Sequence, residues 1–135
     1  FTTDNKIFWK FKSGAAVSSV AETDEGVLVT SLDNFVYFLS DYNGDVIWKR
    51  RLPGRLVEGG LIVDNYLVVL LYGENSGYAI DMKTGKVFDT LPGIDADLVN
   101  RAPVAVREKT FAFTTTASLE IYSIGGCHST KKGGP

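Results

Sequence analysis

The chain has 135 residues, of which 44% are hydrophobic, 12% aromatic and 22% charged, a composition typical of one ordinary globular unit. Its formal net charge of −2 excludes the strongly basic surface that nucleic-acid-binding proteins use. The single cysteine, Cys127, excludes an internal disulfide, and the most apolar stretch, residues 61–72, is too short and too interrupted by polar residues to cross a membrane as a helix.

Short apolar segments separated by turn residues run through the chain, and they predict an all-β fold. Residues 35–39 are apolar at every position, which is typical of a strand buried on both faces. A Pro-Gly pair follows the first two groups of segments. The predicted segments are a lone strand at 1–12, four-strand sets at 15–52 and 56–91, a three-strand set at 101–124, and a flexible tail at 125–135.

Two tight turns with related sequences lie 41 residues apart, at Gly44 and Gly85 (85 − 44 = 41). Glycine accepts positive φ and therefore closes a tight turn between antiparallel strands. Tyr37, Tyr78 and Tyr122 follow a similar spacing, of 41 and then 44 residues. Four strands at a period near 40 are typical of β-propeller blades. The sequence therefore predicts about three four-stranded antiparallel blades. Because it begins within the pattern, we expect the C-terminal portion of a longer propeller.

The second turn resembles the repeat of the quinoprotein-like (PQQ-type) β-propeller family, Ala-x-Asp-x-x-Thr-Gly-x-x-x-Trp. Ala79, Asp81, Thr84 and Gly85 match this pattern, and Asp89 stands where the Trp is expected. From its place in a turn, Asp81 is expected to accept hydrogen bonds from nearby backbone N–H groups. The resemblance implies that the Gly and Trp are packing residues, with the Trp docked on the neighbouring blade. Other copies keep Gly44 and Trp48, then Trp9 alone in an opening fragment, while a third copy begins at Ser123-Ile124-Gly125 and then departs.

Cofactor chemistry belongs to one branch of the resembled family, the dehydrogenases that bind pyrroloquinoline quinone (PQQ) with calcium. Many of these have adjacent cysteines, which this sequence lacks. The only histidine, His128, lies beside Cys127 in the Gly- and Lys-rich tail, where nothing fixes its orientation for catalysis or metal binding. Nothing in the spacing of the 16 acidic residues selects a catalytic pair. We therefore expect no catalytic, cofactor or metal site, and PQQ with calcium only if the chain is a fragment of such a dehydrogenase.

Three charged residues, Arg55, Glu58 and Arg101, precede the first strand of a predicted blade. Such connections lie on one rim of a propeller, and arginine there, with Tyr42 or Tyr66 nearby, suits contacts with another protein. Ordinary solvated loops explain these residues equally well. The leading hypothesis is a non-enzymatic scaffold that presents loops to another protein. The alternatives are a fragment of a PQQ-dependent dehydrogenase and a propeller that binds a small ligand or sugar.

The expected partners follow from the blade count. Two or three blades alone would leave apolar blade faces uncovered at both ends, and such faces need another protein, the missing blades of a longer chain, or further copies of this chain. No nucleic acid and no membrane span are expected. Proteins with the resembled repeat are mostly extracytoplasmic, so the resemblance implies the periplasm or cell envelope.

Overall fold

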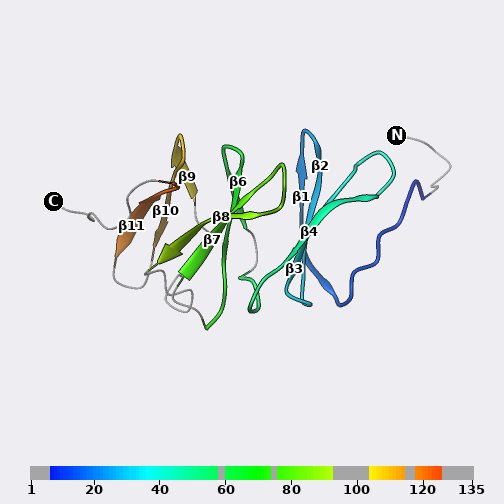
Figure 1. The fold of residues 1–135 in the computed structure, drawn as a ribbon, viewed down its shortest axis with the longest axis horizontal. Helices are drawn as coiled ribbons and strands as arrows, with labels where there is room; N and C mark the ends of the chain where they lie inside the picture. Colours follow the sequence, from blue (N-terminus) through cyan, green and yellow to red (C-terminus); the bar gives the residue numbers. More distant parts are fainter. Residues whose placement is uncertain (1–6, 58–59, 74–75, 93–103, 115–117, 126–135) are drawn as a thin grey trace. The chain divides into compact units, whose positions relative to one another are not determined.

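The computed structural model contains eleven strands in its described residues and no helix there (Figure 1). The strands form three antiparallel sheets. The chain divides into two compact units, Phe1–Leu52 and Pro53–Pro135, and each is described by itself. The described residues are 7–57, 60–73, 76–92, 104–114 and 118–125.

The first unit contains one four-stranded sheet, the first sheet, with the strand order β1-β2-β3-β4. Its strands are β1 (Val17–Thr23), β2 (Gly26–Ser31), β3 (Phe35–Leu39) and β4 (Val46–Arg51). Four of the five residues of β3 are buried, which confirms the prediction for residues 35–39. One face of the sheet carries the buried side chains of Val29, Tyr37 and Leu39, and Trp9 and Phe11 pack against them.

The second unit contains a four-stranded sheet, the second sheet, and a three-stranded sheet, the third sheet. The strand orders are β5-β6-β7-β8 and β11-β10-β9. The second sheet consists of β5 (Leu61–Val63), β6 (Tyr66–Leu70), β7 (Ser76–Asp81) and β8 (Val87–Pro92). The third consists of β9 (Val104–Arg107), β10 (Thr110–Thr114) and β11 (Leu119–Ser123).

The core of the second unit lies between these two sheets. Side chains alternate between the two faces of a strand, so Phe111 and Phe113 of β10 share one face, which we call the inner face of the third sheet. Both rings are buried in a cluster with residues of the second sheet, namely Val63, Val68, Leu70, Ala79 and Leu91. The third sheet is thus fixed to the second by its inner face.

The strands fall within the predicted four- and three-strand sets, except that β8 runs one residue further, to Pro92. The lone strand predicted at residues 1–12 is not a strand in its described part, 7–12. A strand needs a neighbouring strand to satisfy its backbone hydrogen bonds, and none of the described strands pairs with this segment. Side chains hold it on the first sheet instead. Residues 126–135 of the predicted tail lie outside the described residues.

The repeat spacing changes within the third sheet. Tyr66 and Thr110, the first residues of β6 and β10, each follow a two-residue turn and are 44 residues apart (110 − 66 = 44). Their cross-strand partners, Asp81 on β7 and Ser123 on β11, are 42 apart (123 − 81 = 42). Tyr122 therefore does not hold the place of Tyr78, as its spacing of 44 predicted. Glu120 holds that place, and Ile121 holds the place of Ala79.

Candidate functional site

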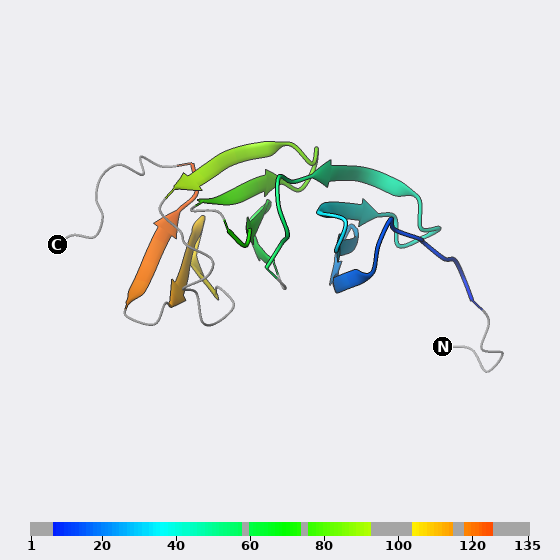
Figure 2. The same ribbon diagram turned by 90° about the horizontal axis from the view of Figure 1, so that it is seen from below.

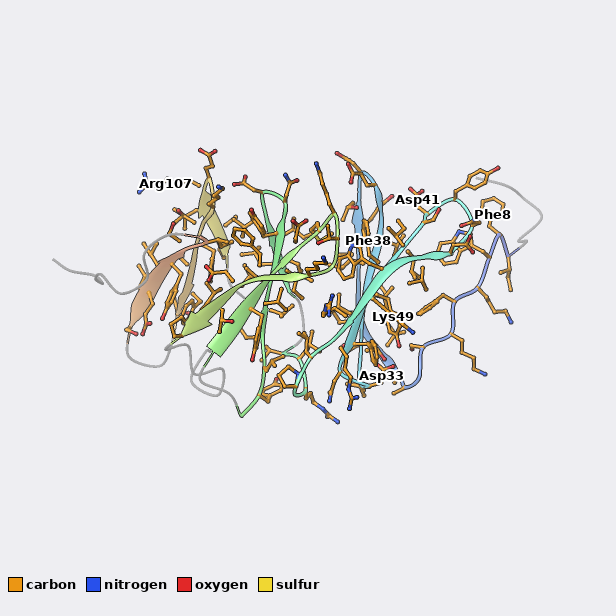
Figure 3. All side chains as sticks on the ribbon, viewed as in Figure 1. Phe8, Asp33, Phe38, Asp41, Lys49 and Arg107 are labelled. Carbon is orange, nitrogen blue, oxygen red and sulfur yellow. The ribbon has the colours of Figure 1, made fainter. Side chains whose placement is uncertain are left out.

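The N-terminal segment, residues 7–12, is held on the first sheet by Trp9. Trp9 Nε1 donates a hydrogen bond of 3.1 Å to the backbone oxygen of Asp41, in the β3–β4 turn. Gly44 of the same turn has φ 81°, and a Cβ built there would lie 2.5 Å from Cε3 of the Trp9 ring. Only glycine fits both restrictions. Figure 3 shows Phe8 and Asp41 at the same end of the first sheet. The structure thus brings Trp9 and Gly44 together.

Strand β8 contacts the turn after β11 in a similar way. The N–H of Gly125 donates a hydrogen bond of 2.9 Å to Asp89 Oδ2. Gly125 has φ 75°, and a Cβ built there would lie 3.2 Å from Cε2 of Phe88. Asp89 stands at the Trp position of the repeat, which Trp9 holds in the opening fragment. The N-terminal segment therefore lies against the first sheet as β8, a fourth strand, lies against the third.

The remaining repeat residues shape turns and core. Asp81 Oδ1 accepts a hydrogen bond of 2.8 Å from the N–H two residues further on, as a turn carboxylate does. Gly85, with φ 76°, donates its N–H to the Asp81 carbonyl at 2.7 Å. Thr84 Oγ1 accepts from the N–H two residues further on at 3.2 Å. Trp48 is buried opposite Phe38, with 5.6 Å between the ring centroids. Their placement assigns these side chains to packing and turn geometry.

Of the three residues of the predicted rim, one lies within the described residues. Arg55 is exposed, and its carbonyl accepts a hydrogen bond of 2.9 Å from the N–H of Tyr72. Glu58 and Arg101 lie outside the described residues. Of the two nearby tyrosines, Tyr66 packs on Phe88, with 4.7 Å between the ring centroids. The rim stays a prediction.

No group of three His, Cys, Asp or Glu side chains in the described part of the chain is arranged to hold a metal ion. His128 and Cys127 lie outside that part. The described residues also contain no helix long and apolar enough to cross a membrane. The PQQ and calcium alternative stays a prediction.

Asp33, in the turn between β2 and β3, is a polar centre that sequence reasoning missed. Its Oδ2 accepts hydrogen bonds from Tyr37 Oη at 2.7 Å and the N–H of Gly14 at 3.0 Å, and its Oδ1 accepts one from the N–H of Phe35 at 3.1 Å. Burial raises the pKa of Asp33, but the hydrogen bonds from Tyr37, Ser31, Phe35 and Gly14 together hold it below its ordinary value. Burial, then the hydrogen bond to Asp33, and then the charge of Asp33 raise the pKa of Tyr37. The centre ties the end of the N-terminal region to the first sheet.

Besides the contact between Gly125 and Asp89, two polar contacts join the second and third sheets beside their apolar core. Asp64 Oδ2 accepts a hydrogen bond of 2.9 Å from the N–H of Lys109. The Tyr122 hydroxyl donates one of 2.9 Å to the carbonyl of Pro92. Burial, and then the negative charge of Glu120, raise the pKa of Tyr122. These contacts fix the third sheet at its turn and at its β11 strand.

The other face of the third sheet, which we call the outer face, is apolar and exposed. Val104, Ala112 and Ile121 are direct cross-strand partners and form one row over the three strands. Val104 is 63% exposed, Ile121 59%, and Leu119, on the same face of β11, 65%. The equivalent row of the second sheet contains Val68 and Ala79, which are buried in the core. The outer face is therefore the candidate site for a partner.

The third sheet also has an open edge. In the first and second sheets the third strand pairs on both sides, but β11 pairs with β10 alone among the described residues (Figure 2). An edge strand of this kind presents unpaired backbone N–H and C=O groups to another strand. The outer face and the open edge meet at β11.

Neither the protein-family models nor the curated proteins that were compared with this sequence give a match. Among solved structures, BamB from Moraxella catarrhalis is similar with a TM-score of 0.70 and 12% identity, over 86% of this chain and 36% of that chain. The computationally designed Ika4 protein gives 0.68 and 12%, over 88% of this chain and 73% of that one. BBS1N, solved in complex with ARL6DN, gives 0.57 and 15%, over 84% and 36%.

These likenesses concern the fold alone, because the identities are low. The chain spans 36% of the length of the BamB chain. The three antiparallel sheets and their match to these structures show that the chain is all-β and is built of β-propeller blades.

Proposed function

We propose that this chain is a non-enzymatic β-propeller scaffold that binds another protein through the outer face of the third sheet. One observation carries the proposal: the row of Val104, Ala112 and Ile121 is apolar and open, whereas the equivalent row of the second sheet is buried against a neighbouring sheet. Exposed apolar patches of this kind mark sites of protein interaction. The scaffold role, rather than catalysis, also fits the assignment of the repeat residues to turns and packing.

The second sheet indicates what kind of surface the partner presents. Its equivalent face is covered by Phe111 and Phe113, two aromatic rings on one face of a β-strand. A partner for the outer face therefore offers an apolar, partly aromatic sheet face of its own. BBS1N, a protein of similar fold, was solved with a protein partner, which supports this class of function. Loops on the predicted rim, with Arg55, would add polar contacts at the margin.

An extracytoplasmic location is part of the proposal. It rests on the resemblance of the repeat to quinoprotein-like propellers. Fractionation of the native cells with detection of the chain in the envelope or periplasmic fraction would support it, and recovery with the cytosol would contradict it.

Site-specific cross-linking tests the interaction. A photoreactive phenylalanine placed at Ile121 should trap a partner in native cells that the same group at Lys83, exposed in the β7–β8 turn, does not trap. The trapped protein is then purified and titrated against the chain. Because a charge on the outer face must be desolvated in the complex, Ile121→Lys should weaken binding at least about tenfold, whereas Lys83→Glu should not.

The proposal is wrong if both positions trap the same proteins. It is equally wrong if the purified partner binds the Ile121→Lys variant as tightly as the unmodified chain.

A further inference from the structure

Two parts of the chain are each half of the same structural unit. A complete sheet of this protein has four strands, as the first and second sheets show. The third sheet has three strands among the described residues, and no strand there pairs with the second edge of β11. Residues 7–12 have the sequence of a fourth strand but pair with no described strand. Within the described residues, the third sheet thus has no fourth strand, and residues 7–12 resemble a fourth strand but belong to no sheet.

The contacts of residues 7–12 support this identification. Trp9 packs on Gly44 in the turn after β3 of the first sheet, and Phe88 and Asp89 of β8 contact Gly125 in the turn after β11 of the third. In each case a fourth-strand segment lies against a turn of the sheet that follows it along the chain. Residues 7–12 therefore already occupy the position that a fourth strand takes on its neighbour.

Two large apolar side chains of this segment are exposed. Ile7 is 72% exposed and Phe8 81%, whereas Trp9 and Phe11 pack against the first sheet. Large apolar side chains at such exposure on an unpaired segment indicate that a neighbour is missing. We propose that the open edge of β11 binds residues 7–12 of a second copy of this chain as its fourth strand, head to tail. The inference rests on the proposed function, because it names the protein that covers the outer face.

The register of the complete sheets predicts the pairing. Phe38 pairs with Trp48 in the first sheet, and the equivalent pair in the second is Ala79 with Asp89. Ile121 holds the place of Ala79 on β11, and Trp9 holds the place of Trp48 in the repeat. Ile121 of one copy therefore pairs with Trp9 of the other.

The neighbouring pairs in this register are complementary. One residue along, Tyr37 pairs with Lys49 in the first sheet, and the equivalent pair between copies is Glu120 with Lys10. The next pair is Leu119 with Phe11. Two apolar pairs thus flank one pair of opposite charge, and such cross-strand pairs stabilise a sheet in addition to its backbone hydrogen bonds. A shift by one residue would place Glu120 opposite Phe11 or Trp9, so the register is specific.

The same arrangement covers the outer face. Strand addition to β11 brings the outer face of one copy against the face of the first sheet on which Trp9 and Phe11 lie in the other copy. This repeats the packing of the second sheet on the third within one chain. Because the contact joins two different surfaces, it is head to tail, and successive copies form a closed ring or an open row.

A disulfide between copies tests the register directly. In a Cys127→Ser background, one variant carries Lys10→Cys and another Glu120→Cys, so that neither can form the expected disulfide alone. Mild oxidation of the mixture should yield about tenfold more disulfide-linked dimer than either variant alone, because directly opposite residues meet the geometry of a disulfide. A mixture of Lys10→Cys with Lys83→Cys, on an exposed turn, measures random collision and should give little dimer.

The solution mass of the unmodified chain is the second measurement. It should exceed the 14.7 kDa of one chain, and Ile121→Lys should return it to the monomer value. A monomeric unmodified chain, or mixed dimer no more abundant than in the collision control, overturns the inference. If either result appears while Ile121→Lys still abolishes binding of a different protein, the proposed function stands and only the second copy is wrong as the occupant.

Discussion

The second and third sheets have equivalent strands, but equivalent side chains on them differ in their exposure to solvent. Val68 and Ala79, in one row of the second sheet, are 0% exposed, because the aromatic inner face of the third sheet covers them. Ala112 and Ile121 hold the same places in the third sheet, and Ile121 is 59% exposed. Both rows consist of apolar residues. Burial is therefore decided by whether a neighbouring sheet is present, and the apolar row without one is the binding surface that we propose.

The largest expected effect separates the two faces of the third sheet. Phe111→Ala removes a fully buried ring of the inner face and should lower the free energy of unfolding by about 3–5 kcal/mol. Ile121→Ala, on the outer face, should change it by less than about 0.5 kcal/mol in dilute solution, because that side chain is already in water. Urea unfolding of both variants at low protein concentration measures the difference.

The comparison of Phe111→Ala with Ile121→Ala has an internal control, the dependence of each cost on protein concentration. The cost of Ile121→Ala should grow at concentrations where copies associate, and that of Phe111→Ala should stay constant. Equal costs for both variants in dilute solution would mean that the outer face is covered within a single chain, and the comparison between the sheets would fail.

The next effect tests whether the N-terminal segment is a true counterpart of β8. Gly44→Ala combines a positive φ with a clash against Trp9 and should lower stability by about 2–3 kcal/mol. Gly73→Ala is the matched control: its φ of 78° is similar, but no heavy atom of the described residues lies within 4 Å of the added Cβ, so it should cost only about 1 kcal/mol. Unfolding curves followed by tryptophan fluorescence report both values. Equal costs would show that Trp9 does not dock on the turn in solution.

A smaller effect concerns the polar link between the second and third sheets. Asp89→Ala removes the acceptor for the N–H of Gly125 and should lower the free energy of unfolding by about 1 kcal/mol. Asp89→Asn keeps an acceptor oxygen and should retain most of the stability. Thermal unfolding of the two variants distinguishes them, and a loss of equal size in both would assign the effect to the charge instead of the hydrogen bond.

The sequence predicted the blades well because their turns depend on local chemistry. Gly44 and Gly85 have positive φ as expected, and the strands around them lie close to their predicted ranges. The predicted equivalence of Tyr122 with Tyr78 was wrong, because the loop before the third strand differs in length between the second and third sheets. Six residues lie between Leu70 and Gly77, the last paired residues of β6 and β7. Only four lie between Thr114 and Leu119, the corresponding residues of β10 and β11. A two-residue difference of this kind shifts the register, and periodicity alone does not detect it.

The candidate site was less predictable for a different reason. The apolar residues Val104, Leu119 and Ile121 have the same pattern as strands that are buried, so nothing local marks them as exposed. The signal was the count of strands, four in two sets and three in the last, which pointed to an incomplete edge. Residues 7–12 were predicted as a strand from the same pattern, and the prediction failed in the described residues because strand structure depends on a partner.

The smallest effect tests how firmly the chain just after the N-terminal segment is fixed to the first sheet, where the N–H of Gly14 donates to Asp33 Oδ2. The pKa of Asp33 in the folded chain lies below its ordinary value of 3.8, so its carboxylate stabilises the fold above that pH, and this contribution is lost as the pH falls through the lower folded-state pKa. Asp33→Asn should cost no more than about 1 kcal/mol at neutral pH, because the amide oxygen still accepts on one side while the amide NH2 loses the backbone N–H on the other, at a partly exposed site. The variant should also lose less stability than the unmodified chain between about pH 5 and about pH 2. Urea unfolding across that range measures both slopes, and identical slopes would show that Asp33 is not the group whose protonation loosens the segment on the first sheet.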